Sequence, residues 1–187
     1  MTMNDRELVR LSKRLSKWLR HDPQGIGLEP DAAGWVPVDV LLRQANGAGT
    51  TITREDLDAV VARNNKQRYE FDETGASIRA RQGHSIPVDL GYTATEPPSI
   101  LFHGTAEHLV DVIMAEGLRP MRRHAVHLSA DVETARTVGG RHGRPVVFDV
   151  AAERMYRHGQ SFYRTGNGVW LVDAVLPQYL AMRHSAD

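Results

Sequence analysis

The chain has 187 residues, and its 23 lysine and arginine residues balance 23 aspartate and glutamate residues, so its formal net charge is zero. With 41% hydrophobic and 25% charged residues it resembles folded globular proteins, and the lack of cysteine excludes disulfides, thiolate metal sites and cysteine nucleophiles. No apolar run reaches the roughly 20 residues of a membrane span and the charged N-terminus is no secretory signal, so we expect a cytoplasmic protein without membrane contact. Taken alone, zero net charge argues against a nucleic-acid partner.

The first half of the chain predicts a helical lobe that ends in a β-hairpin. Residues 5–20 place leucines and a tryptophan on one arc of a helix and six basic residues on the opposite arc. Asp22-Pro23 predicts the end of this helix, because the residue before a proline disfavours helical geometry. The elements expected next are an extended segment at 26–28, a turn at 31–34, helices at 38–45 and 54–64, and hairpin strands at 67–73 and 77–81. A capping box of Thr53 and Asp56 predicts the start of the helix at 54–64.

The best candidate for a domain boundary is residues 84–99, which contain three prolines and several small polar residues. This segment predicts one lobe at 1–90 and a second at 98–187. Since helices followed by a hairpin are typical of winged-helix domains, the first lobe is expected to be one of these, and such lobes often bind nucleic acid.

The second lobe alternates short strands with helices. A helix at 106–116 should bury Leu109, Val112 and Ile113 and end at Gly117. The other elements expected are strands at 100–104, 126–129, 145–150, 161–165 and 168–175 and a short helix at 131–138. The fold class predicted for the chain is therefore α+β.

Familiar catalytic motifs are missing from the sequence. It has no Walker-type phosphate loop, dinucleotide fingerprint, Gly-x-Ser-x-Gly elbow or His-Glu-x-x-His motif. The closest histidine pair, His124 and His127, has no obvious carboxylate beside it, so we expect no metal.

Arginine and histidine instead stand at the ends of expected elements. Arg20 and His21 end the first helix, where spacing alone favours helix capping over a grip on a phosphate. Arg68 belongs to a strand whose alternation is that of a solvated face. His103 precedes Gly104 at a strand end, where a glycine lets a ligand approach but a structural histidine is the more common case.

A second concentration of cations lies at residues 119–144. This stretch carries six arginines and three histidines against two acidic residues, and glycines and strand residues interrupt it, which favours a pocket lining over a solvated face. Within it, His127 and Ser129 point to the same side of a strand, and Arg141 lies in a glycine-rich turn that could contact an anion.

The order of these motifs resembles the KptA/Tpt-type RNA 2′-phosphotransferase family over roughly residues 5–180. The motifs are LSKxLSxxLRHDPxxIGLxxDxxGWVxVDxLL, NxKxRYEF, LFHGT, MRRHxVHLSxDxxTAxxVGxRHG and PVVFDV. The resemblance implies an N-terminal winged-helix RNA lobe and a C-terminal NAD-binding lobe like that of ADP-ribosyltransferases.

The activity that the resemblance implies is removal of an internal 2′-phosphate from tRNA-like RNA, as left by tRNA splicing. The phosphate attacks the nicotinamide ribose of NAD and expels nicotinamide, which gives a 2′-phospho-ADP-ribosylated RNA. The ribose 2″-hydroxyl then attacks the phosphate, giving 2′-hydroxyl RNA and ADP-ribose 1″,2″-cyclic phosphate. NAD is thus a co-substrate and no metal is expected. A monomer is expected, because both lobes would serve one site.

By motif position the resemblance implies a catalytic set of Arg20, His21, Arg68 and Arg141. The first three would hold the 2′-phosphate, Arg141 would act in the transesterification, and His21 could protonate the departing RNA oxygen. The NAD-binding residues that the resemblance implies are His103, Gly104, Thr105, Gly117, Leu118, Arg119, His127 and Ser129.

Two other classes of function remain open on the sequence. One is an ADP-ribosyltransferase that modifies nucleic-acid 5′-phosphates or protein, although the strand at 168–175 lacks the Glu that protein-modifying members usually carry. The other is a winged-helix RNA-binding protein without catalysis. The balance of charge no longer excludes RNA, because cations concentrate on the helix at 5–20 and at 119–144, but long-range attraction to RNA should be weak.

Overall fold

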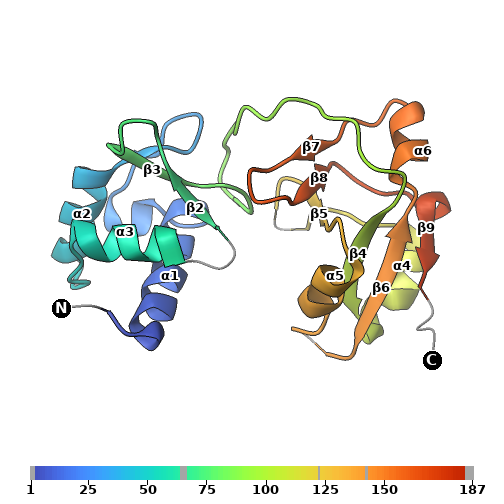
Figure 1. The fold of residues 1–187 in the computed structure, drawn as a ribbon, viewed down its shortest axis with the longest axis horizontal. Coiled ribbons are helices and arrows are strands. Elements are labelled where there is room, and N and C mark those ends of the chain that lie inside the picture. Colours follow the sequence, from blue (N-terminus) through green and yellow to red (C-terminus); the bar gives the residue numbers. More distant parts are fainter. Residues whose placement is uncertain (1–2, 64–66, 122, 142, 184–187) are drawn as a thin grey trace. The chain divides into compact units, whose positions relative to one another are not determined.

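The computed structural model describes residues 3–63, 67–121, 123–141 and 143–183. Helices and small antiparallel sheets alternate along the chain, which confirms the α+β fold class (Figure 1). By its internal contacts the chain divides into two compact units, Met1–Gly91 and Tyr92–Asp187, called unit 1 and unit 2 below. No helix within the described ranges is both long and apolar enough to cross a membrane.

Unit 1 packs three α-helices against a three-stranded antiparallel sheet. Its elements are α1 (Asp5–Arg20), the 3-10 helix η1 (Gln24–Ile26), β1 (Val36–Pro37), α2 (Val38–Gly47), α3 (Arg54–Arg63), β2 (Tyr69–Phe71) and β3 (Ser77–Ala80). The strand order is β1-β3-β2, so the short strand β1 extends the predicted hairpin. Leu15 on α1, Leu57 on α3 and Ile78 on β3 are fully buried and belong to the same hydrophobic core.

Helix α1 forms over the residues that the leucine spacing predicts. Asn4 and Glu7 make a capping box at its start, and His21 is its C-cap, with its N–H donating to the carbonyl of Lys17. The predicted apolar arc is buried, and it consists of Leu8, Leu11, Leu15, Trp18 and Leu19. The basic arc therefore stays on the outside of unit 1, except for its last residue, Arg20, which is partly buried.

The segment after α1 differs from the prediction. Ile26 and Gly27 are not extended, because the Asp22 carboxylate accepts the Gly25 N–H at 3.0 Å next to the start of the 3-10 helix η1. Gly27 ends that helix in the left-handed conformation, with φ 72°. A short turn thus replaces the expected strand. The sequence signal for this turn was Asp22, because an aspartate side chain often accepts a backbone N–H a few residues later.

The other predictions for unit 1 concern helix ends and the hairpin. The capping box of α3 is confirmed, since the Thr53 N–H donates to Asp56 at 2.9 Å and the Asp56 N–H returns to Thr53 Oγ1 at 3.2 Å. Asn64, the expected last residue of that helix, lies outside the described residues. The hairpin is confirmed, with Glu70 opposite Arg79.

Unit 2 contains two three-stranded antiparallel sheets in the orders β4-β6-β9 and β5-β8-β7. Its elements are β4 (Leu101–Ala106), η2 (Glu107–Leu109), α4 (Val110–Glu116), β5 (Val126–Leu128), α5 (Val132–Gly139), β6 (Pro145–Val150), α6 (Ala152–Arg157), β7 (Tyr163–Arg164), β8 (Trp170–Val172), η3 (Pro177–Tyr179) and β9 (Leu180–Met182). The backbones of Phe102 and Ser129 exchange hydrogen bonds of 2.9 and 2.8 Å. This bridge joins β4 to the end of β5.

The helix expected at 106–116 is only partly as predicted. Gly117 ends it as expected, at φ 82°, but the helix begins as the 3-10 turn η2. Ile113 is buried, whereas Leu109 and Val112, also expected to face inward, are 41% and 55% exposed. A 3-10 turn has three residues per turn, so it breaks the 3.6-residue pattern on which that prediction rested.

Two glycines let α5 pack closely on β4 (Figure 1). A Cβ at Gly104 would lie 1.6 Å from the carbonyl oxygen of Ala135 on α5, and one at Gly139 would lie 2.7 Å from backbone atoms of Thr105. Neither position can hold a side chain. The glycine after His103 therefore has a structural reason, which is the close approach of a helix.

Replacing Gly104 with alanine should destabilise unit 2 by on the order of 3 kcal/mol, because the added methyl would overlap the backbone of α5. The measurement is the free energy of unfolding from urea denaturation. Gly47→Ala on α2 is the matched control, since nothing lies within 4 Å of a Cβ there, and its effect should stay within about 1 kcal/mol. Equal effects of the two substitutions would contradict the close contact of α5 with β4.

Candidate active site

The C-terminal end of α1 presents Arg20 and His21 where the chain turns. Arg20 is partly buried, and its guanidinium carbon lies 6.0 Å from the centre of the Tyr69 ring. His21 is exposed, and its backbone N–H, not its ring, caps the helix. Helix capping therefore does not account for the presence of a histidine side chain here.

Ser85 holds the ring of His21 in place. Its Oγ lies 2.9 Å from His21 Nδ1 and 3.4 Å from the carbonyl oxygen of Arg20, which also accepts the Ser85 N–H at 2.9 Å. A carbonyl can only accept, so the hydroxyl donates to Arg20 and accepts the proton of His21 Nδ1. This arrangement leaves Nε2 as the atom of neutral His21 that can take up a proton. Sequence reasoning missed Ser85, because it lies 64 positions from His21.

Arg68 lies directly before β2 and is partly buried. Its carbonyl accepts the Arg81 N–H at 2.9 Å, which continues the pairing of the hairpin. The next residue, Tyr69, is buried and donates its hydroxyl to the carbonyl of Ser12 on α1. Tyr69 thus ties the strand that follows Arg68 to the helix that ends at Arg20.

Glu70 adds a carboxylate to this region, and two arginines compensate its charge. Its oxygens lie 2.7 Å from Arg79 Nε and 3.3 Å from Arg81 Nε, and all three side chains are at most 24% exposed. Arg79 also stacks on Trp35, with its guanidinium carbon 4.4 Å from the ring centre. The carboxylate is therefore already engaged by cations of the sheet.

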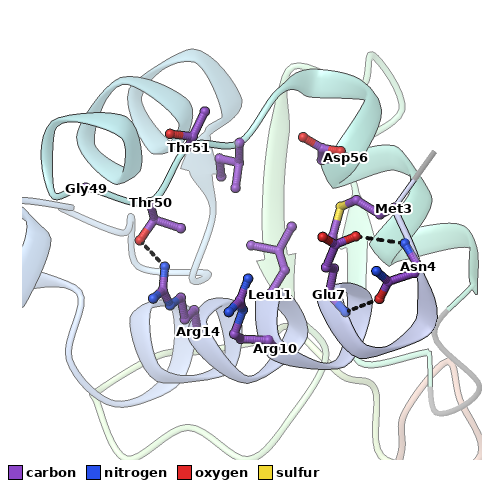
Figure 2. Close-up of a pocket in the computed structure, with 11 residues that line it drawn as sticks. Met3, Asn4, Glu7, Arg10, Leu11, Arg14, Gly49, Thr50, Thr51 and Asp56 are labelled. Carbon is purple, nitrogen blue, oxygen red and sulfur yellow. Dashed lines mark hydrogen bonds between the residues drawn. The ribbon is translucent and has the colours of Figure 1, made fainter. Parts of the chain in front are cut away.

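A groove of about 550 Å³ opens beside the N-terminal half of α1 (Figure 2). The residues that line it are Met3, Asn4, Glu7, Arg10, Leu11, Arg14, Gly49, Thr50, Thr51, Ile52 and Asp56. Figure 2 shows Arg14 beside Thr50, to whose hydroxyl it donates at 2.5 Å, while Glu7 and Asp56 lie toward the other end. The groove contains none of the site residues predicted from the sequence, and its mixed charges favour no single ligand.

In unit 2, strands β4 and β5 bring His103 and His127 together. His103 Nδ1 lies 3.2 Å from the carbonyl oxygen of His127, so the ring donates to that carbonyl. Burial lowers the pKa of His103 from its usual 6.5 against the opposing effect of this bond, and the charge of Arg123 lowers it further. His103 is therefore neutral at pH 7, with its lone pair on Nε2.

Arg123 completes this cluster, although no sequence motif had marked it as a site residue. Its Nη1 lies 3.3 Å from His127 Nδ1, so the guanidinium donates and the ring accepts. Partial burial and the positive charge of Arg141 lower the pKa of Arg123, which places the two guanidinium groups within electrostatic reach. Two neighbouring cations attract an anion. The spacing Arg-x-x-x-His was the sequence signal for this contact, but six arginines in the same stretch made it hard to distinguish.

The loop before this cluster is tied into the framework of unit 2. Leu118 exchanges backbone hydrogen bonds of 2.8 and 2.9 Å with Val175, and its side chain is 4% exposed. A Cβ at Gly117 would lie 2.1 Å from the carbonyl oxygen of Val175. Of the three residues implied here, only Arg119 presents a polar side chain, which is exposed and 3.9 Å from Glu116.

The remaining implied NAD residues lie on β4 and at the end of β5. Thr105 is 6% exposed under α5, and Ser129 uses both backbone groups to pair with Phe102. Arg122 and His142, which belong to the cationic stretch at 119–144, lie outside the described residues. Within the described part of the chain, no three His, Asp or Glu side chains are arranged to hold a metal ion.

The neutral state of His103 should make unit 2 less stable in acid. The unfolded chain takes up this proton near pH 6.5 and the folded chain resists it, so the free energy of unfolding falls as the pH drops below about 6.5. His103→Asn, which can donate the same hydrogen bond, should weaken this dependence in urea unfolding between about pH 7.5 and 5. The same change at the exposed His108 is the control, and an unaltered pH dependence in H103N would contradict the prediction.

Comparison of the chain with known proteins identifies its family. Residues 6–174 match the family described as "RNA 2′-phosphotransferase, Tpt1 / KptA family". A "Probable RNA 2′-phosphotransferase" of Herpetosiphon aurantiacus is 50% identical over 180 residues, 96% of this chain and 99% of that protein. Proteins of the same name from Trichormus variabilis and Streptomyces griseus are 53% and 50% identical, covering 96% and 97% of this chain and 99% and 100% of their own. Nearly the whole chain is thus shared, and it belongs to the Tpt1/KptA family of RNA 2′-phosphotransferases.

Proposed function

We propose that the chain transfers an internal 2′-phosphate of RNA to NAD, giving 2′-hydroxyl RNA, ADP-ribose 1″,2″-cyclic phosphate and nicotinamide. Membership of the family supports a transferase that acts on an RNA 2′-phosphate. The single observation that carries the proposal is the cluster of Arg123 and Arg141 beside His103 and His127, which suits an anionic co-substrate.

The first step needs cations and no general base. The 2′-phosphate is already ionised at pH 7, so one of its oxygens can attack the anomeric carbon of the nicotinamide ribose directly. A carbon–oxygen bond forms as the glycosidic carbon–nitrogen bond breaks, and its electron pair leaves with neutral nicotinamide. Two anionic reactants must meet, which arginine stabilises and carboxylate does not. Arg20, His21 and Arg68 hold the phosphate in this proposal.

The second step is a transesterification at phosphorus. The ribose 2″-hydroxyl attacks the phosphorus and loses its proton, while the RNA 2′-oxygen leaves and gains one. Arg141 stabilises the charge that develops on the phosphate. Arg123 lies within electrostatic reach of Arg141 and contacts the same anion in this proposal. His21 supplies the proton from Nε2, the ring atom that Ser85 does not hold.

The residues proposed for NAD lie on β4, in the loop after α4 and on β5. They are His103, Gly104, Thr105, Gly117, Leu118, Arg119, His127 and Ser129. A neutral His103 with a lone pair on Nε2 can accept a hydrogen bond, and the neighbouring guanidinium of Arg123 suits a pyrophosphate. The framework role of Leu118 makes Arg119 the stronger candidate within that loop.

The same proposal assigns a role to each unit. Three helices packed with the sheet β1-β3-β2, whose strands β2 and β3 follow the last helix, support a winged-helix RNA lobe for residues 1–90. Two small sheets bridged at Phe102 and Ser129 support an ADP-ribosyltransferase-like lobe for residues 98–187. We further propose a cytoplasmic monomer that needs no metal and acts on tRNA-like RNA such as a splice junction.

The test of this function is incubation of the protein with NAD and an oligonucleotide that carries one internal 2′-phosphate. The expected products are a 2′-hydroxyl oligonucleotide and free nicotinamide in equal amounts. Stable ADP-ribose on RNA or protein without loss of phosphate would instead support an ADP-ribosyltransferase. RNA binding without any NAD consumption would support a binding protein and overturn the proposal.

In that assay, Arg68→Ala should reduce phosphate transfer by a factor of about 100 or more, since it removes a guanidinium from the phosphate. Its thermal unfolding should stay close to that of the parent protein. Arg43→Ala is the matched control, an exposed arginine on α2 that pairs only loosely with Asp39 at 3.9 Å. If R68A lost its cooperative unfolding transition, Arg68 would be structural instead.

Ser85→Ala should lower kcat by roughly 10-fold and alter the pH profile, because His21 loses the partner that orients its ring. The Ser85 N–H bond to Arg20 remains in this variant, so the helix end should stay in place. Ser85→Thr keeps the hydroxyl and should restore both kcat and the profile. In a His21→Ala background the serine change should have no further effect, and an additive loss would exclude a role through His21.

A further inference from the structure

One side of α1 carries a line of basic side chains that the proposed chemistry does not use. Arg6, Arg10, Lys13 and Lys17, called the basic stripe below, are spaced four, three and four residues apart, so they lie along one side of the helix. Arg20 continues this line three residues later. At about 1.5 Å of rise per residue, the distance along the axis from Arg6 to Arg20 is about 21 Å.

The basic stripe is exposed and mostly uncompensated. Its four side chains face solvent, opposite the buried arc of α1. Arg6, Arg10 and Lys13 make no ion pair with any residue that the structure describes. Lys17 lies 3.2 Å from Asp22, but both side chains are well exposed and such a pair contributes little.

The acidic residues of α1 do not neutralise the stripe. Glu7 accepts the backbone N–H of Asn4 in the capping box, and Asp5 pairs with Arg63 on α3 at 2.9 Å. Figure 2 shows Arg10 and Arg14 on the α1 side of the groove, so positive charge also extends sideways from the stripe toward Thr50. The stripe is thus a local concentration of positive charge in a chain without net charge.

We propose that the RNA strand next to the 2′-phosphate runs along the basic stripe, with its backbone phosphates against Arg6, Arg10 and Lys13. This inference rests on the proposed function, which places the 2′-phosphate at Arg20. An RNA strand that starts there carries a regular series of negative charges, and the stripe offers a regular series of positive ones from the same point. Such contacts position RNA without reading its sequence, so the stripe recognises the length of the substrate.

A membrane surface fits the stripe less well than RNA. A helix that binds a bilayer inserts an apolar face, but the apolar face of α1 is in the core of unit 1. Val9 is the one large apolar side chain that α1 exposes, at 56%. An acidic protein would pair with the charges of the stripe. It would not explain why the stripe leads to Arg20, the residue that is proposed to hold an RNA phosphate.

The test compares two substrates that share the reacting group. One is a dinucleotide with a 2′-phosphate, and the other is an oligonucleotide of about 12 nucleotides with the 2′-phosphate at its centre. The variant is Arg6→Gln/Lys13→Gln, because neither side chain has a bond within the described fold to lose. The control is Arg43→Gln/Arg157→Gln, which also removes two exposed charges, each paired with a carboxylate on its own helix.

For the long substrate, kcat/KM of the R6Q/K13Q variant should fall roughly 10- to 30-fold at about 0.1 M salt. Its dependence on the logarithm of salt concentration should become shallower by about 1.4, the value for two lost phosphate contacts on a single strand. The dinucleotide should react as with the parent protein, and the control variant should match the parent on both substrates.

Three results would overturn the inference. They are an unchanged reaction of the long substrate, an equal loss for the dinucleotide, and an equal loss in the control variant. Fluorescence anisotropy with the labelled long RNA gives a second measurement that does not depend on turnover, and R6Q/K13Q should bind it more weakly. A polyglutamate peptide that binds the parent protein as tightly as this RNA does would identify an unspecific anion surface instead.

A failure of the proposed function looks different from a failure of this inference. If the parent protein converts neither substrate, the chemistry is wrong. If it converts both and R6Q/K13Q does not discriminate between them, the chemistry stands and the basic stripe has no part in it.

Discussion

Repulsion between like charges is the constraint on which the rest of the structure depends. Arg123 and Arg141 are close enough for one to lower the pKa of the other, and no carboxylate is bonded to Arg123 among the described residues. Such a pair is unfavourable until an anion arrives, so the surrounding fold must hold it in place. His127 does this in part, since its Nδ1 accepts a hydrogen bond from Arg123.

In each unit, hydrogen bonds and close packing hold the candidate site residues in place. In unit 2, the bridge between Phe102 and Ser129 fixes β4 against β5, and Gly104 lets α5 lie directly on β4. In unit 1, Tyr69 ties the hairpin to α1, while Ser85 bonds the backbone of Arg20. In both units, uncharged groups therefore hold the segments that carry the cations.

Much of the fold follows from local signals. Helix α1 could be predicted to the residue because its leucine spacing, its basic arc and the Asp22-Pro23 stop all agree. The strands β1 and β9 could not be predicted, because two or three residues are too few to show an alternating hydrophobic pattern. Their pairing partners also lie far away in the chain. The prediction of which residues of the helix at 106–116 face inward was wrong for a related reason, since the helix begins with a 3-10 turn that has a different period.

By itself, the sequence determined the family, because the order and spacing of the motifs can be recognised without coordinates. It placed Arg20 and His21 at the end of a helix, since capping patterns are local, but it was wrong to place His103 at a strand end, because β4 continues to Ala106. Only the tertiary structure decided that Ser85 orients His21, that Arg123 joins Arg141, and that Leu118 belongs to the core. These facts depend on contacts between distant segments, and hydrogen bonds, burial and charge act through space and not along the chain.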